Sequence, residues 1–262
     1  MPNGIFNTNA ANTAAVLATA TGAGPGSNAV HATTTSPSDS AVYGEHTGTG
    51  IGVFGRGGID GGEGVFGQVD NTTASGVYGK NQSAGNGGIG VSAESVNGIG
   101  LVSTGGILAG LFQGDIRVTG DVYLTGGDCA EQFDISAVGQ SEPGTVMVIS
   151  SSGKTLEPSC RPYDTKVAGV ISGAGNCRPG IVLDKQISDA KRADIALIGR
   201  VYCKVDADVA PITVGDLLTT SDIQGHAMKA VDERRSFGAV IGKALQPLDT
   251  GRGLIPIMVA LQ

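Results

Sequence analysis

The sequence predicts an all-β protein with two parts. The first is a repetitive triangular β-helix or β-prism stalk built by an intertwined homotrimer, and the second is a compact β-barrel-like C-terminal domain. One short motif returns every 10–14 residues in the first half of the 262-residue chain. Residues 1–127 also hold 30 of the 44 glycines. Residues 128–262 instead alternate short apolar segments with turn residues, as globular β-domains do.

The repeat consists of a small residue, a valine, often an aromatic residue and a glycine, followed by a turn rich in Gly, Asn, Ser and Thr. Valine and aromatic residues favour strands, and glycine suits tight turns and close backbone contacts, so each copy predicts one short strand and one corner. A helix is excluded because glycine costs about 1 kcal/mol at each interior helical position. The structural repeat residues of the four best copies are Val42, Tyr43, Gly44, Val53, Phe54, Gly55, Val65, Phe66, Gly67, Val77, Tyr78 and Gly79.

One chain is poorly able to fold these repeats alone. Ordering a repeat costs more backbone entropy than the burial of one valine and one aromatic side chain recovers. Three chains that each contribute one strand and one corner would close a triangular ring, which favours the intertwined homotrimer. A single-chain solenoid and a flat stack of sheets are the alternatives. Residues 1–40 are then a low-complexity segment with the first degenerate repeats, and residues 41–110 form the stalk.

The chain changes character at residues 111–127, which we expect to form a neck. Ile116, Val118, Val122 and Leu124 alternate with polar residues, and this pattern predicts two short strands around Gly120. Residues 128–262 form the C-terminal β-domain, with seven strands predicted at 145–149, 167–171, 180–183, 195–205, 216–219, 237–245 and 254–261. Residues 185–193 are predicted as a short helix or a loop. The predicted core residues are Val146, Val148, Val170, Leu197, Val201, Leu217, Val240, Ile257 and Val259.

The composition argues against two classes of partner. The net charge of −7 and the lack of a Lys/Arg cluster argue against nucleic acid. No run of eighteen apolar residues exists, so we expect no membrane insertion. The first residues lack the basic start and apolar core of a signal peptide, and we therefore expect assembly in the cytoplasm.

No motif predicts a catalytic, cofactor-binding or metal-binding residue, and we do not expect an enzyme. The pattern GxGxxG occurs at residues 50–55, 62–67 and 85–90, but the repeat generates it and no helix follows, so no nucleotide cofactor is predicted. The sequons at residues 71–73 and 81–83 indicate turns rather than glycans. The three histidines lie in no catalytic motif: His31, His46 and His226.

An acidic cluster and two cysteine pairs are the remaining candidates for chemistry. Three copies of the cluster could hold a cation in a trimer, or Lys and Arg of a neighbouring chain could neutralise it. Its members are Asp128, Glu131 and Asp134. Asn176-Cys177 and Ser159-Cys160 are pairs of the kind that support self-cleavage, although loop cysteines commonly have no such role. The cysteines contain no CxxC pair, so buried free thiols are favoured over disulfides or zinc ligands, with Cys203 on an apolar strand face.

Two stretches carry a family resemblance. The Gly-Val-(Tyr/Phe)-Gly repeats leading into residues 114–124, GDIRVTGDVYL, resemble the shafts of phage tail fibres and tail appendages. A similar layout occurs in proteins of cyanobacteria and other bacteria, followed by a domain much like the one that begins with DCAEQFD at residue 128. More distantly, residues 195–202, 214–218 and 238–244 resemble the C-terminal domain of pre-neck appendage proteins, an intramolecular chaperone that cleaves itself. No nucleophile or base of that family matches a residue of this chain.

The resemblance implies a structural and adhesive fibre component of a phage tail or phage-tail-like particle. Its partners would be two further copies of itself, other fibre, tail or baseplate proteins, and a cell-surface glycan or protein receptor. Its place would be the surface of the virion or particle, outside the cell after release. Two alternatives stay open at this point: an autoproteolytic chaperone domain that trimerises the stalk, and a bacterial surface or matrix fibre unrelated to a particle.

Overall fold

The computed structural model describes residues 16–20, 28–35, 40–47, 49–57, 63–70, 74–82, 88–136, 141–186 and 190–261. The chain divides into two compact units, Met1–Leu111 and Phe112–Gln262, which are treated separately below. The described residues contain ten strands and one four-residue helix, so the predicted all-β class is confirmed.

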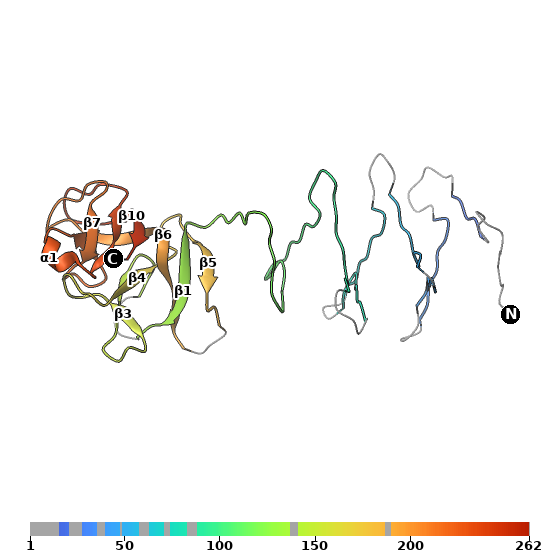
Figure 1. Ribbon diagram of the computed structural model, residues 1–262, viewed down its shortest axis with the longest axis horizontal. Helices are drawn as coiled ribbons and strands as arrows, with labels where there is room; N and C mark the ends of the chain where they lie inside the picture. Colours follow the sequence, from blue (N-terminus) through green and yellow to red (C-terminus); the bar gives the residue numbers. More distant parts are fainter. Residues whose placement is uncertain are drawn as a thin grey trace. The chain divides into compact units, whose positions relative to one another are not determined.

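The first unit contains no strand and no helix among its described residues. In Figure 1 its described segments run back and forth, and successive repeats meet through their glycines. A Cβ placed on Gly55 would lie 2.3 Å from the carbonyl oxygen of Gly64, and one on Gly67 would lie 2.3 Å from that of Gly76. Only glycine permits this approach. In the described part of this unit the strands predicted for the repeats do not form within one chain, because no described neighbouring segment forms a ladder with them.

The neck, residues 112–127 of the second unit, also lacks a strand, and the two strands predicted around Gly120 are wrong for the single chain. Ile116, Val118 and Val122 are 63%, 53% and 64% exposed, so the alternation that predicted strands has no buried face here. A strand forms only where a second strand accepts its backbone hydrogen bonds, and no strand of the described residues pairs with residues 112–126. Gly127, at the end of the neck, donates to the Arg178 carbonyl at 2.9 Å and accepts from the Arg200 amide at 2.8 Å.

The remainder of the second unit, which we call the head, contains all seven predicted strands. The strands β2, β4, β5, β6, β7, β9 and β10 span Val146–Ile149, Val167–Ile171, Pro179–Leu183, Arg192–Asp206, Leu217–Thr220, Val240–Ala244 and Arg252–Ala260. Four elements were not predicted: β1 (Asp128–Asp134), β3 (Leu156–Pro158), β8 (Ala227–Lys229) and α1 (Glu233–Ser236). No helix forms in the described part of residues 185–193, and β6 begins there instead.

Five strands of the head close into a barrel. The strands β6, β8, β7, β9 and β10 pair in this order, and β10 returns to β6 along nine residues, from Arg252 opposite Asp206 to Ala260 opposite Ile198. The predicted barrel-like domain is therefore confirmed (Figure 1). Its interior holds fully buried aliphatic side chains, including Val201, Ile241 and Ile257.

The fifteen-residue strand β6 also belongs to a second, smaller ring. Its first half pairs with β1 and β4, β4 pairs with β2, and β2 pairs with β3. A single bridge between Ile135 and Leu156 joins β3 to the end of β1. The register of β6 against β1 shifts between Cys129 and Ala130, and Gly199, opposite Asp128, has a φ of +109°. This ring encloses Ile135, Met147, Leu156, Ile171 and Ile195.

Seven of the nine predicted core residues are buried: Val146, Val148, Val170, Val201, Val240, Ile257 and Val259. Leu197 is partly buried against the smaller core. Leu217 was predicted wrongly, because it is 36% exposed while the next residue, Leu218, is fully buried. Side chains alternate along a strand, and the sequence of two adjacent leucines does not indicate which one faces inward.

Candidate functional site

The four best repeats expose an apolar surface, which we call the repeat face. The aromatic side chains of Tyr43, Phe54, Phe66 and Tyr78 are 73–76% exposed. The exposed fractions of the preceding valines, Val42, Val53, Val65 and Val77, lie between 67% and 72%. Such similar values mean that each copy presents its two apolar side chains in the same way. Large apolar side chains that stay exposed in every copy are typical of a protein–protein contact.

The last glycine of each copy determines how the next copy packs. A Cβ placed on Gly44, Gly55 or Gly67 would lie 2.4, 2.5 or 2.8 Å from Cγ2 of the valine in the following copy. Gly79 has the same relationship, at 2.4 Å, with Val91 of the degenerate copy that begins at residue 90. The geometry thus repeats along the chain. It places the valine against a glycine backbone and leaves the aromatic ring free on the outside.

Exposed apolar residues continue after the fourth copy. Leu101 and Val102 are 72% and 75% exposed, and in the neck Phe112 and Tyr123 are 69% and 91% exposed. His31, which takes the aromatic position of an earlier copy, is exposed as well. These apolar side chains recur with the period of the repeat and stay exposed in the described chain. We therefore expect a partner surface with a matching period.

The acidic cluster predicted in the sequence does not form. Asp128 is buried and accepts a hydrogen bond from the Ser172 hydroxyl at 3.0 Å, whereas Asp134 pairs with Arg192 at 3.3 Å at the other end of β1. Burial raises the pKa of Asp128. Glu131 lies between them on the strand. Within the described residues, no three His, Cys, Asp or Glu side chains come together to hold a metal ion.

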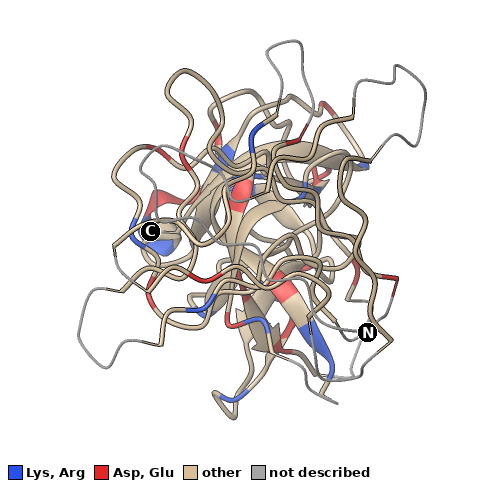
Figure 2. Cartoon of the chain, turned by 90° about the vertical axis from the view of Figure 1, so that its right-hand side faces the viewer, with Lys and Arg blue, Asp and Glu red and all other residues tan. Residues whose placement is uncertain are grey.

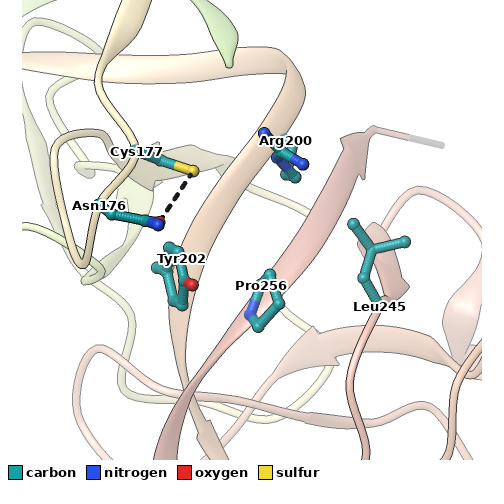
Figure 3. A pocket seen from close by; sticks show the side chains of 6 residues that line it. All are labelled: Asn176, Cys177, Arg200, Tyr202, Leu245 and Pro256. Carbon is teal, nitrogen blue, oxygen red and sulfur yellow. Dashed lines mark hydrogen bonds between the residues drawn. The ribbon is translucent and has the colours of Figure 1, made fainter. Parts of the chain in front are cut away.

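The Asn176-Cys177 pair lines a hollow of about 310 Å³ on the head, shown in Figure 3. The Cys177 sulfur lies 3.9 Å from Asn176 Oδ1, and the other lining residues are Arg200, Tyr202, Leu245 and Pro256. None of these six side chains is a base able to take the thiol proton, which nucleophilic attack requires. The hollow therefore lacks the partner that self-cleavage at this pair would need.

All four cysteines are free thiols, as predicted. The prediction that they are buried holds for Cys203 and is wrong for Cys160, which is exposed. Ser159, the neighbour of Cys160, is fully buried, so this pair does not present two reactive groups together. Sequence alternation indicated the burial of Cys203 because it lies in a long strand, whereas Cys160 lies in a loop.

The two other histidines have local roles. The amide of Gly50 donates to His46 Nδ1 at 3.1 Å, and the His226 ring lies 2.8 Å from the Gln224 carbonyl. The described residues 56 and 57 after the GxGxxG pattern at residues 50–55 are not helical. Gly62, Gly85 and Gly87 of the other two patterns, the sequon at residues 71–73 and residue 83 of the second sequon lie outside the described residues.

The charged residues that the structure describes are spread over many segments of the chain. Figure 2 shows Lys and Arg on separate segments, interspersed with Asp and Glu. Arg235, which follows Arg234 in the sequence, stacks on Tyr163. Among the described residues, no helix has the length and apolar character needed to cross a bilayer.

Two solved structures of bacteriophage phi29 proteins are similar to part of this chain. The first is the C-terminal fragment of gene product 12 of bacteriophage phi29, at 13% identity and a TM-score of 0.35, covering 51% of this chain and 100% of the fragment. The second is the N base of the phi29 head fibre gp8.5, at 16% identity and a TM-score of 0.25, covering 51% of this chain and 90% of that protein. No described protein family and no curated protein matches the sequence.

Proposed function

We propose that this chain is a structural and adhesive fibre protein whose repeats bring three copies together into an intertwined stalk. The observation that carries the proposal is the repeat face, in which Tyr43, Phe54, Phe66 and Tyr78 are each about three-quarters exposed. Burying one such ring stabilises an assembly by about 1.5–3 kcal/mol. Four rings that recur every 11 or 12 residues therefore offer a strong and extended contact surface.

The partner that fits the repeat face is the same repeat in another copy. A surface with a period of 10–14 residues is matched along its whole length only by one with the same period. The described stalk residues and residues 112–126 of the neck form no strand within one chain, so these segments can still pair as strands with another chain. Association with further copies would thus bury the apolar side chains of the repeat and pair its backbone hydrogen-bonding groups.

The length of the repeat favours three copies. One repeat provides one short extended segment and one corner, and three such units from three chains close a triangle. The glycine contacts between successive copies set a regular rise along the axis of that triangle. The head, with two closed cores of its own, is suited to hold the three chains in register or to contact a receptor or another component of the particle.

The proposed setting is a phage tail or phage-tail-like particle, with other fibre, tail or baseplate proteins as further partners. The resemblance of the repeats and of residues 114–124 to tail-fibre shafts supports this setting. Self-cleavage is less well supported, because the hollow at Cys177 contains no base. A surface or matrix fibre of a bacterium would use the same trimer without a particle.

The test is the mass of the full-length protein in solution, measured by light scattering after size exclusion. We expect three times the chain mass of 26.1 kDa. Replacing both Phe54 and Phe66 by serine removes two rings of the repeat face, and we expect loss of the trimer. Phe237→Ser is the matched control, since Phe237 is 93% exposed but lies on the head. A folded wild-type monomer contradicts the proposal, and an intact mass that reveals two fragments favours self-cleavage.

A further inference from the structure

The longest strand pair of the head turns one face outward. β6 and β10 pair over nine residues, and their odd-numbered side chains, including Val201, Cys203 and Ile257, are fully buried inside the barrel. The even-numbered side chains point away from the barrel interior, because side chains alternate along a strand. We call this surface the β6–β10 face. Its members are Arg200, Tyr202, Lys204, Arg252, Leu254 and Pro256.

Two hollows open on the β6–β10 face. The hollow of about 310 Å³ described above contains Arg200, Tyr202 and Pro256, which lies directly opposite Tyr202 (Figure 3). A second hollow, of about 490 Å³, contains Lys204, Arg252 and Leu254. Leu254 lies directly opposite Lys204, so this pair is the next one along the same face. The two hollows are therefore neighbours along one pair of strands.

A loop packs against each hollow through a glycine. A Cβ placed on Gly175 would lie 2.8 Å from Cδ2 of the Tyr202 ring, and one on Gly144 would lie 2.8 Å from Cδ1 of Leu254. Gly175 and Gly144 have φ values of +62° and +91°, which also favour glycine. The amide of Lys204 donates to the Gly144 carbonyl at 2.8 Å. The walls of both hollows are therefore held in place within the single chain.

Each hollow contains one guanidinium group that the chain itself does not use. Arg200 and Arg252 are exposed, and neither side chain forms an ion pair or a hydrogen bond with the described residues. Lys204 differ from them, because it pairs with the exposed Glu142. Asp206, opposite Arg252, is buried and accepts hydrogen bonds from other groups of the head. The β6–β10 face therefore carries two cations that are open to an anionic ligand.

Groups that suit hydroxyls lie beside both guanidinium groups. The Tyr202 hydroxyl and the Asn176 amide line the first hollow, and His226 lines the second. The Gln224 carbonyl can only accept a hydrogen bond, so His226 Nδ1, 2.8 Å away, carries a proton. In the neutral ring Nε2 is then an acceptor, which suits a hydroxyl donor. Apolar side chains of β10 complete both hollows.

We propose that the β6–β10 face binds an acidic oligosaccharide, with one carboxylate of the ligand at Arg200 and another at Arg252. Arginine binds carboxylates with two parallel hydrogen bonds. The polar groups beside the arginines match the hydroxyls of sugar rings, and the apolar side chains match their C–H groups. A few polar groups that orient a ligand on apolar walls are typical of binding sites. The inference rests on the adhesive part of the proposed function and not on the number of copies in the fibre.

The distribution of charge favours a saccharide over a nucleic acid. Arg252 lies opposite Asp206, six residues along β6 from Arg200, which corresponds to about 20 Å. A nucleic acid strand carries one phosphate per about 3.4 Å, or roughly six over this distance. Two guanidinium groups are too few to neutralise them, and the whole chain has a net charge of −7. A ligand with few and widely spaced carboxylates therefore fits the face better.

The experiment measures binding to the full-length protein by titration calorimetry. The probes are oligosaccharides of hyaluronan and of gellan, which carry carboxylates on only some of their sugars. The control ligands are the same oligosaccharides with each carboxylate reduced to a hydroxymethyl group. We expect the acidic forms to bind, with an affinity that falls as salt is added, and the reduced forms not to bind.

Variants locate the binding on the β6–β10 face. Arg200→Gln and Arg252→Gln should each weaken binding about tenfold, since each loses a charge-assisted contact. Both arginines are exposed, so we expect both variants to fold. Arg161→Gln is the matched control, because Arg161 is exposed on the head but lines neither hollow.

Four results would overturn the proposal. They are unchanged affinity in a variant that carries both Arg200→Gln and Arg252→Gln, equal binding of the acidic and reduced oligosaccharides, failure of both acidic probes to bind, and tighter binding of single-stranded DNA than of either probe. The last result would replace the saccharide by a nucleic acid.

Light scattering on the same samples separates this proposal from the trimer. A trimer that binds no acidic oligosaccharide overturns the saccharide site and leaves the trimeric stalk in place. A monomer that binds the acidic oligosaccharides overturns the trimer and leaves the saccharide site in place.

Discussion

The guanidinium carbon of Arg235 lies 4.5 Å from the centroid of the Tyr163 ring. The same side chain donates a hydrogen bond to the Pro162 carbonyl at 3.0 Å, and the Tyr163 hydroxyl accepts one from the amide of Asp232 at 2.8 Å. Tyr163 has a φ of +60°, a region that non-glycine residues rarely occupy. These contacts hold the loop before β4 against α1 and maintain its strained backbone.

Arg235→Ala should therefore destabilise the head by about 1 kcal/mol, through the lost cation–π contact and hydrogen bond. Arg235→Lys should recover only part of this loss, because lysine lacks the planar group that stacks on the ring. The measurement is the urea midpoint of head unfolding in the full-length protein. Arg234→Ala is the control, since Arg234 is an exposed neighbour on the same helix. Equal losses for the two alanine variants would contradict the role of the stack.

Gly169→Ala should be strongly destabilising. Gly169 has a φ of +148°, and an added Cβ would lie 2.4 Å from the Ala196 carbonyl oxygen and 2.8 Å from Cγ2 of Ile195. We expect a loss of about 2–4 kcal/mol from backbone strain and overpacking together. Gly153 has a φ of +70° with nothing within 4 Å of the added Cβ, so Gly153→Ala should cost about 1 kcal/mol. Thermal unfolding of both variants measures how much more Gly169→Ala destabilises the head than Gly153→Ala. This difference is the cost of the steric clash at residue 169.

In the repeats, Gly76→Val should block assembly. A Cβ at Gly76 would lie 2.7 Å from the carbonyl oxygen of Gly67 in the preceding copy, so the branched side chain separates the two copies. Gly106→Val is the control, because nothing lies within 4 Å of a Cβ at that position. We expect trimers from the control and aggregated or monomeric protein from Gly76→Val, as measured by light scattering. Soluble trimeric Gly76→Val protein would show that the copies do not need to pack closely.

The pair of Asp216 and Lys229 should make the head less stable in acid. Burial raises the pKa of Asp216, but hydrogen bonds from Lys229 and Thr213 outweigh it and hold the pKa below the usual range. A carboxyl group whose pKa is lower in the folded state stabilises the protein above its unfolded pKa, and this contribution is lost as the pH falls through the folded pKa. Asp216→Asn should cost about 1–3 kcal/mol at pH 7. The difference in unfolding free energy between Asp216→Asn and wild type should narrow below about pH 4, as measured by urea unfolding at a series of pH values.

The thiols should differ in reactivity. Burial raises the pKa of the Cys203 thiol, and this residue is fully buried, so its thiolate is scarce and out of reach of reagents. Cys160 is exposed and should react with an aromatic disulfide reagent in the native protein. Mass spectrometry of labelled peptides should find Cys203 modified only after unfolding, and Cys160→Ser should remove the fast phase. Rapid native labelling of Cys203 would contradict its place in the barrel.

The head strands were predictable where the sequence combines β-branched residues with clear turn signals. β4 begins and ends at the predicted residues, 167 and 171. β3 and β8 were not predicted because each is only three residues long. β3 also contains a proline and β8 a lysine, which are uncommon in strands. β1 escaped because its residues are mostly polar or half-buried, and its partners on β5 and β6 are distant in sequence.

The site shows a similar division. The spacing of the motif alone predicted the twelve repeat residues, glycines included, because each copy repeats the same local sequence. The β6–β10 face could not be found in this way. It depends on Tyr202 lying opposite Pro256, and on Lys204 lying opposite Leu254, which are contacts between segments far apart in the chain. Long-range register of this kind follows from the tertiary fold and leaves no periodic signal.

The shared strand β6 has a consequence for how the head loses its structure. Its first half closes the smaller ring and its second half closes the barrel, so disorder that begins in one half of β6 reaches the strand that closes the other ring. The two cores are therefore expected to melt as one cooperative unit. Residues 150–155, which join β2 to β3 outside both rings, are a place where foreign peptide can be grafted while the spacing of the two cores is preserved.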